Sequence, residues 1–216
     1  MAGKAHAGPG AGGDVRERLL EGATALFASK GYAGTTVREI VERAGVTKPV
    51  LYYYFRSKEG IYLELMREPF GRFAAVVDAA VRADAAAKQR LFRLCLATYD
   101  IFNENIDAAR VMYSIYYGPP QGAPFIDFDA YHRRFQNAVL QVLREGIRSG
   151  EFRRVDPRDA MWAVIGALNV AMEVELCHPP QSLGRAGVRR VLEVVLEGIG
   201  RNGKAGRKDR KKGRAK

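Results

Sequence analysis

The sequence predicts an all-α protein, and three observations carry that prediction. Apolar residues recur at the 3.6-residue spacing of amphipathic helices along most of the chain. No stretch shows the sustained alternation of apolar and polar residues that marks a strand. Helix-start and helix-stop signals, such as Thr36 before one helix and Gly45 after it, punctuate the pattern. Together they predict an N-terminal three-helix bundle and a larger C-terminal helical domain, about nine helices in all.

Residues 35–58, TTVREIVERAGVTKPVLYYYFRSK, predict two short helices around an Ala-Gly-Val turn. Thr36 and Glu39 have the spacing of a capping box, in which hydroxyl and carboxylate each satisfy a backbone N–H. Gly45 then ends the first of these helices. Thr47 stands where its side chain can cap the second one.

The second of these helices has an inward pair and an outward set of side chains. Leu51 and Phe55 lie four residues apart and are expected to be buried together. The three tyrosines at 52–54 sweep about 200° of a helix, so at least one of them must be exposed. Four side chains are left pointing outward: Lys48, Pro49, Tyr52 and Tyr53. This geometry matches a helix-turn-helix, whose second helix enters the major groove of DNA.

The other helices follow from the same signals. Asp14 and Glu17 form a second capping box, and Gly31 is placed as the residue that ends that first helix. A long helix starts near Lys58, where Pro69 and Gly71 are expected to kink it. Five more helices are predicted at approximate ranges: 87–103, 107–117, 127–149, 157–176 and 186–200.

The formal net charge of +11 is concentrated at the two ends of the chain. Residues 1–60 hold nine Lys and Arg against six Asp and Glu, and residues 61–200 hold seventeen of each. Residues 201–216 hold nine against one. Such a pattern suits termini that meet a polyanion around a neutral body. Residues 1–13 and the basic tail 201–216 are expected to be disordered, and the tail either only solubilises the chain or adds salt-sensitive DNA affinity.

Composition favours a cytoplasmic, non-enzymatic protein. Cys95 and Cys177 lie in apolar helical patterns and are expected to be buried thiols in a reducing compartment. The start of the chain lacks the apolar core of a signal peptide, and the apolar run at 160–172 is too short to span a bilayer. No catalytic constellation, metal-ligand cluster or phosphate loop stands out, so no metal and no cofactor are expected.

The last two predicted helices have the properties of a homodimer interface. Small side chains in 157–176 would let another helix approach closely, and 186–200 carries a narrow apolar stripe. Two such helices from each of two subunits would form a four-helix bundle, although both faces could instead pack inside one monomer. The residues expected at this interface are Ala163, Gly166, Ala167, Val188, Leu192 and Val195.

Residues 14–65 resemble the N-terminal domain of the TetR family of transcriptional regulators. Thr-Thr, Ala-Gly-Val-Thr, Leu-Tyr-x-Tyr-Phe and Ser-Lys-Glu stand in the family's register. The resemblance implies a DNA-binding domain over 14–60 and a helical ligand-binding and dimerisation domain over 61–200. It also implies a protein that is nucleoid-associated when bound to a double-stranded DNA operator. The implied DNA contacts are Thr36, Thr47, Lys48, Pro49, Tyr52, Tyr53 and Lys58. Many members of the family have Gly where Pro49 stands, which alters the atoms that reach the bases.

A regulator of this kind needs an effector, and residues 95–135 are dense in aromatic side chains. Apolar pockets between helices are common ligand sites, so a small apolar or aromatic effector is expected, with the helix that starts at Lys58 as the lever. The expected pocket residues are Tyr99, Phe102, Tyr113, Tyr117, Phe128, Tyr131, Phe135, Trp162, Asn169 and Met172. Aromatic residues at this spacing are also typical of a core.

The leading hypothesis is therefore a ligand-responsive repressor that binds a palindromic operator as a dimer. Two alternatives remain open. The chain could be a helical small-molecule carrier or enzyme with a structural N-terminal bundle, or it could be a transcriptional activator of the same family. The missing catalytic constellation speaks against an enzyme, and the outward tyrosines speak against a carrier.

Overall fold

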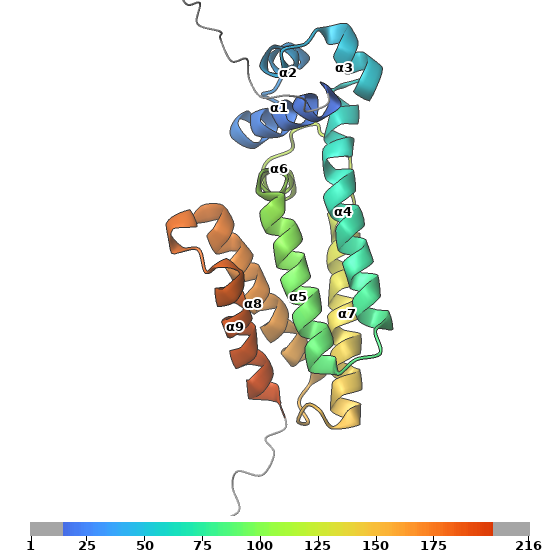
Figure 1. The fold of residues 1–216 in the computed structure, drawn as a ribbon, viewed down its shortest axis with the longest axis vertical. Coiled ribbons are helices and arrows are strands. Elements are labelled where there is room, and N and C mark those ends of the chain that lie inside the picture. Colours follow the sequence, from blue (N-terminus) through green and yellow to red (C-terminus); the bar gives the residue numbers. More distant parts are fainter. Residues whose placement is uncertain (1–14, 201–216) are drawn as a thin grey trace, which may run out of the picture. The chain divides into compact units, whose positions relative to one another are not determined.

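The computed structural model describes residues 15–200, and these residues form nine α-helices (Figure 1). The helices are α1 (Val15–Lys30), α2 (Val37–Ala44), α3 (Lys48–Phe55), α4 (Lys58–Arg82), α5 (Ala87–Glu104), α6 (Ile106–Tyr116), α7 (Phe128–Ser149), α8 (Pro157–Cys177) and α9 (Gly184–Ile199). Among the described residues the only β geometry is an isolated bridge between Phe152 and Gly200. The all-α prediction is thus confirmed. Asp14 and the tails predicted at 1–13 and 201–216 lie outside the described residues.

The described part of the chain divides into two compact units. Unit 1 comprises residues 15–70 and 105–126, so it contains α1, α2, α3, the first half of α4, and α6. Its core joins Leu19 and Phe27 of α1 to Leu51 of α3, each with no exposed surface. Val111 of α6 belongs to the same core. The helix-turn-helix therefore rests on a bundle that includes a helix from later in the chain. A functional division at residue 60 stays a prediction.

Unit 2 comprises residues 71–104 and 127–200 within the described part of the chain. In it α5, α7, α8 and α9 run side by side around one apolar core (Figure 1). The buried guanidinium of Arg90 fixes the end of α4 against them. Its Nε donates to Ala80 O at 2.8 Å, its Nη2 donates to Val81 O at 2.9 Å, and its Nη1 pairs with Glu145 at 2.5 Å. Arg90 therefore satisfies carbonyls that the helix end leaves open.

Most of the predicted helix signals are realised, and one is not. Gly31 and Gly45 follow α1 and α2 with φ of 77° and 66°, the left-handed region that favours glycine. Ser57 caps α4 by accepting a hydrogen bond from Gly60 N at 3.1 Å. Thr47, however, makes no side-chain cap to α3, so that expectation was wrong. α4 continues through Pro69, and the boundary between the two units falls directly after Phe70.

Candidate nucleic-acid interface and ligand surfaces

The capping box at Thr36 fixes the start of α2. Glu39 N donates to Thr36 Oγ1 at 3.2 Å, and Thr36 N donates to Glu39 Oε2 at 2.9 Å. Glu39 also pairs with Lys30. The hydrogen bond from Lys30, followed by those from Thr36, lowers the pKa of Glu39 to about 2. Glu39 is therefore negatively charged at neutral pH, and its carboxylate lies at the N-terminus of α2, where the helix dipole favours a negative charge.

Helix α3 separates buried from exposed aromatic residues as predicted. Leu51 is fully buried and Phe55 is 6% exposed, and both pack in the unit 1 core. Tyr52 and Tyr53 are 47% and 81% exposed. Tyr54 is 37% exposed, and its ring lies 5.1 Å from that of Tyr53 in an edge arrangement. The outward face of α3 therefore presents three phenol groups.

The residues at the two helix starts are open to solvent. Thr36, Thr47, Lys48 and Pro49 are all exposed. The carbonyl oxygen of Thr47 accepts from Val50 N at 3.1 Å, so the backbone of this residue starts α3 while its side chain does not cap it. A hydroxyl that caps no helix can donate to another acceptor. These four positions thus lie on a surface that an anionic ligand can reach.

Lys58 does not present its whole ammonium group to solvent. Nζ donates to the carbonyls of Tyr32 and Thr35 at 3.0 Å each. It also lies 4.2 Å from the centre of the Tyr32 ring, within the range of a cation–π contact. Two of its three N–H donors are thereby used inside unit 1, which leaves one for the expected phosphate contact. In this structure Lys58 mainly fixes the start of α4 to the turn between α1 and α2.

Arg56 was missed by the sequence reasoning. It follows α3 directly, its side chain is exposed, and its backbone has φ 64° and ψ −30°, which L residues rarely adopt. It is the one non-glycine residue with positive φ among those the structure describes. Strained residues of this kind concentrate at functional sites. A basic residue two positions after the tyrosine run was the signal that could have identified it.

Gln121 was also missed, because its role depends on tertiary structure. It lies in the Gly-Pro-Pro-Gln loop after α6, within unit 1. Its Oε1 accepts from Tyr32 N at 2.8 Å, and its Nε2 donates to the carbonyl and hydroxyl oxygens of Ser114 at 3.2 and 3.0 Å. One side chain thus joins α6 to the turn that precedes the helix-turn-helix.

The expected dimer residues fall into two groups. Val188 and Leu192 are each 1% exposed and belong to the unit 2 core, so their assignment to an interface was wrong. The α9 stripe packs against the protomer's own helices. Ala163 is exposed, whereas Gly166, Ala167 and Val195 are partly exposed.

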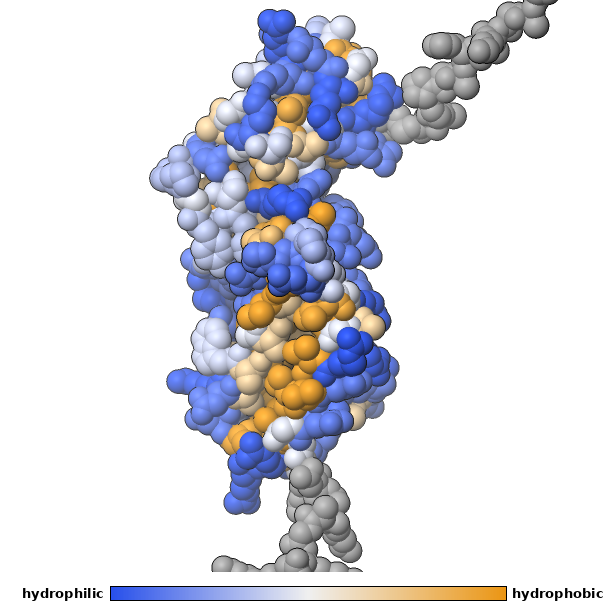
Figure 2. Space-filling view, turned by 90° about the vertical axis from the view of Figure 1, so that its left-hand side faces the viewer, coloured by the Kyte–Doolittle hydropathy of each residue, from blue (hydrophilic) through white to orange (hydrophobic). Residues whose placement is uncertain are grey.

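A different apolar set is exposed on α8 and α9. Trp162 and Val170 of α8 are 58% and 60% exposed, and Val194 of α9 is 73% exposed. Figure 2 shows hydrophobic side chains gathered on the face of unit 2 that carries these helices. An exposed apolar surface of this kind marks an interaction site.

Helix α8 is also long and apolar enough to cross a membrane. Core helices of soluble proteins pass the same test of length and composition. Val164 and Leu168 of α8 lie in the unit 2 core.

The ten expected effector residues do not form one described pocket. Tyr113 and Tyr117 belong to unit 1, and the other eight belong to unit 2. Trp162 and Asn169 are exposed, so they do not line an internal wall. Met172, Phe135 and Tyr99 pack in or against the unit 2 core, where Tyr99 Oη donates to Glu175 at 2.7 Å. The carboxylate of Glu175 is thus partly occupied within the protomer.

The two thiols differ from each other. Cys95 is buried, and burial raises its pKa to about 12. Cys177 is exposed at the end of α8, which corrects the expectation that both are buried. Within residues 15–200, no group of three or more His, Cys, Asp and Glu side chains could hold a metal ion.

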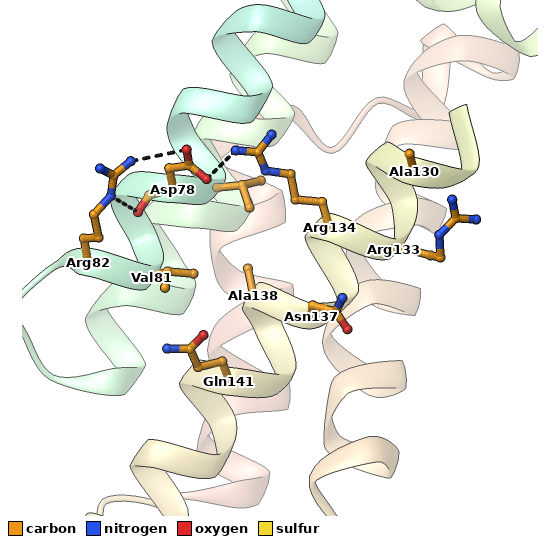
Figure 3. Close-up of a pocket in the computed structure, with 10 residues that line it drawn as sticks. Asp78, Val81, Arg82, Ala130, Arg133, Arg134, Asn137, Ala138 and Gln141 are labelled. Atoms are coloured by element: carbon orange, nitrogen blue, oxygen red, sulfur yellow. Dashed lines mark hydrogen bonds and ion pairs between the residues drawn. The ribbon is translucent and has the colours of Figure 1, made fainter. Parts of the chain in front are cut away.

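Unit 2 contains a groove between α4 and α7 with a cavity volume of about 560 Å³ (Figure 3). We call it the α4–α7 groove. Its lining residues are Val77, Asp78, Val81, Arg82, Ala130, Arg133, Arg134, Asn137, Ala138 and Gln141. None of the ten expected effector residues is among them. The groove combines an apolar floor with a rim of arginine and amide side chains, a composition found in ligand sites.

Comparisons with known proteins agree with this architecture. A family model for bacterial regulatory proteins of the tetR family matches residues 19–65. A second model, for the C-terminal domain of tetracyclin repressor-like proteins, matches residues 84–173. The transcriptional repressor KstR2 of Mycobacterium tuberculosis is 33% identical over 195 residues, which cover 87% of this chain and 94% of that protein.

Solved structures show the same fold. The structure of the ketosteroid transcriptional regulator KstR2 of Mycobacterium tuberculosis has a TM-score of 0.70 at 26% identity, and covers 89% of this chain and 98% of that one. The structure of FadR of Bacillus subtilis in complex with stearoyl-CoA has a TM-score of 0.62 at 23% identity, and covers 84% of this chain and 98% of that one.

A transcriptional activator is also among the relatives in sequence. FasR of Mycolicibacterium smegmatis is 33% identical over 98 residues, which are 45% of each chain.

Proposed function

Because the chain belongs to the TetR family of bacterial transcription regulators, we propose that it is a repressor that binds a palindromic operator as a homodimer and is released by a small effector. The observation that carries this proposal is the outward face of α3. Tyr52 and Tyr53 are exposed there above a buried Leu51. Tyr54 next to them is exposed as well, and contiguous exposed aromatic side chains of this kind are typical of an interaction site.

The proposed DNA contacts divide by chemistry. Thr36 is exposed at the start of α2, and helix N-termini bind anions such as phosphate. Thr47, Lys48 and Pro49 begin α3, the part of a recognition helix that reaches base edges. Tyr52 and Tyr53 would contact phosphates or thymine methyl groups. Arg56 joins this set as an exposed cation at the other end of α3.

A second copy of the chain is the proposed occupant of the exposed apolar surface on α8 and α9. A palindromic operator requires a two-fold symmetric protein, and an isologous interface buries the same patch on both subunits. Trp162, Val170 and Val194 provide the apolar centre of such a patch. A Cβ atom at Gly166 or Gly198 would meet nothing within 4 Å, so a partner helix could approach the backbone there.

Release would follow from a shift between two states of unit 2. In the DNA-bound dimer the recognition helices must stand about 34–36 Å apart to enter successive major grooves. An effector that binds better to a state with another spacing shifts the population away from DNA. α4 begins beside α3 and contributes to both units, so it is the element through which we expect the change to pass.

Mobility-shift measurements with the DNA upstream of the protein's own gene test the proposal. The wild type should shift a specific fragment, and Tyr52→Ala should weaken that shift by about tenfold or more, a typical effect of losing one specific contact. Tyr117→Ala is the matched control, because Tyr117 is a 70% exposed tyrosine of the same unit outside the α3 surface. An equal shift by wild type and Tyr52→Ala, or none with any flanking DNA, would contradict the proposal.

An activator is the second candidate, and the similarity to FasR favours it. Both modes use the same DNA-binding surface, so binding measurements cannot separate them. A reporter fused to the bound promoter does. Deleting the gene should raise expression if the protein is a repressor and lower it if the protein is an activator.

A further inference from the structure

The α4–α7 groove holds two guanidinium groups around a single carboxylate (Figure 3). Asp78 Oδ1 pairs with Arg134 Nη2 at 2.5 Å, and Asp78 Oδ2 pairs with Arg82 Nη2 at 3.2 Å. Both oxygens of Asp78 are therefore used, while each guanidinium has five N–H donors and uses only a few. The pair of arginines keeps an excess of one positive charge at this rim.

These ion pairs are exposed, and exposed pairs are weak. The side chains of Arg82 and Arg134 are 76% and 45% exposed, and that of Asp78 is 38% exposed. Pairs of this kind typically contribute less than about 1 kcal/mol. An anion that binds the two guanidinium groups more tightly than Asp78 does can consequently replace its carboxylate with little loss of free energy. Phosphate and carboxylate groups match the planar fork of arginine and bind it in bidentate fashion.

Below this cationic rim the groove is apolar. Val77 and Ala138 are 2% and 3% exposed and belong to the unit 2 core, and Val81 packs against them. One helical turn further along, the ring of Phe73 lies 6.3 Å from that of Tyr131 and 5.7 Å from that of Phe135. The amides of Asn137 and Gln141 complete the rim. The groove thus provides cationic donors next to an apolar floor, and the three aromatic rings lie outside its lining.

The hollow continues along α7. A second cavity of about 400 Å³ shares Asn137 and Gln141 with the groove and is also lined by Arg144 and Arg148. Its acidic member, Glu145, pairs with the buried Arg90. Cationic side chains therefore border the hollow over much of the length of α7, and a ligand longer than the groove itself still meets them.

We propose that the α4–α7 groove binds an anionic amphiphile, a molecule with a phosphate or carboxylate group and an apolar body, whose anion takes the place of Asp78 on Arg82 and Arg134. The proposal rests on the proposed function only in regarding this ligand as the effector. Because Asp78 and Arg82 belong to α4 and Arg134 belongs to α7, the exchange would replace a contact between these two helices with contacts to the ligand.

Calorimetric titration of the full-length protein without DNA tests the site. The probes are decyl phosphate and decanoate, with decanol as the uncharged analogue. Either anion should bind at least about tenfold more tightly than decanol, because decanol cannot form the charge-assisted hydrogen bonds that an anion forms with Arg82 and Arg134. The more tightly bound of the two identifies the headgroup. Equal binding of decanol would overturn the proposal.

Two substitutions that should change the affinity for the anion in opposite directions distinguish direct binding from a structural role of these residues. Arg134→Gln should weaken binding of the anion about tenfold, and Asp78→Asn should strengthen it severalfold by removing the competing carboxylate. Arg154→Gln removes an exposed arginine of the same unit outside the groove and should have no effect. Weaker binding by Asp78→Asn, or equal losses in Arg134→Gln and Arg154→Gln, would contradict the site.

The effector assignment is tested separately. Decyl phosphate should dissociate the wild-type complex with DNA and leave the Arg134→Gln complex intact at the same concentration. Binding without dissociation would refute the role as effector. A chain that binds the amphiphile but shifts no DNA would refute the proposed function and leave the groove site standing.

Discussion

Gln121 accepts a hydrogen bond from the backbone N–H of Tyr32 at 2.8 Å, across 89 positions of sequence. The carbonyl of Tyr32 in turn accepts from Lys58 Nζ at 3.0 Å. Gln121, Tyr32 and Lys58 therefore connect the loop after α6, the turn after α1 and the start of α4 inside unit 1. The orientation of the helix-turn-helix depends on this connection as well as on the apolar core.

We expect Gln121→Ala to lower the free energy of unfolding by about 1–3 kcal/mol, since Tyr32 is buried and its N–H would lose its acceptor. Urea unfolding at a fixed protomer concentration measures the change. Gln141→Ala is the control, because that exposed amide only donates to the neighbouring Glu145. Equal stability of wild type and Gln121→Ala would show that the loop does not support the turn.

Arg56→Gly should have opposite effects on stability and on DNA binding. Glycine adopts the backbone conformation of Arg56 without strain, so the free energy of unfolding should rise by about 1 kcal/mol. If Arg56 contacts a phosphate, the slope of log K against log salt should become shallower by about 0.9. Arg56→Ala should reduce the slope equally without the gain in stability. An unchanged slope in both variants would remove Arg56 from the interface.

Glu39→Gln should destabilise the protein at neutral pH and have progressively less effect in acid. The pKa of Glu39 is lowered to about 2 by Lys30 and Thr36, whereas in the unfolded chain it is near its ordinary 4.5. Its stabilisation is therefore present above the unfolded pKa and is lost as pH falls toward the folded one. Urea midpoints of both proteins, measured from about pH 7 down to about pH 3, should converge. A constant difference would show that the charge of Glu39 is not responsible.

Val194→Asp and Leu192→Ala should separate assembly from folding. Val194 is 73% exposed, so Val194→Asp should weaken dimerisation by about 2 kcal/mol or more and leave the fold intact. Leu192 lies in the unit 2 core, so Leu192→Ala should cost about 2–5 kcal/mol of stability. Sedimentation velocity and urea unfolding measure the two effects. A dimeric Val194→Asp protein would place the interface elsewhere.

Local sequence signals predicted most of the helices. Thr36, Gly31 and Gly45 act within one turn of their own positions, so the pattern around them is sufficient to identify a helix start or end. Leu51 and Phe55 were recognised as buried for the same reason, because residues four apart share one face of a helix. The prediction that the Thr47 side chain caps α3 was wrong, because the position of a residue at a helix start does not fix the rotation of its hydroxyl group.

Contacts between distant segments could not be predicted in this way. The apolar stripe of α9 shows which side chains seek burial, but Val188 and Leu192 meet the protomer's own core and not a partner. Gln121 and Tyr32 are joined only by folding. The α4–α7 groove was missed because its arginines follow a helical pattern that is also typical of a solvated face, and the aromatic residues drew attention to other positions.

The position of α6 in unit 1 has a consequence for protein engineering. The simplest chimeric regulator would join the DNA-binding segment of one protein to the effector segment of another at a single junction. Here the core beneath the recognition helix includes Val111, which comes from a separate stretch of the chain. A graft of residues 1–70 alone would place α1 against a foreign α6. Transfer of operator specificity should therefore require residues 105–126 as a second insert.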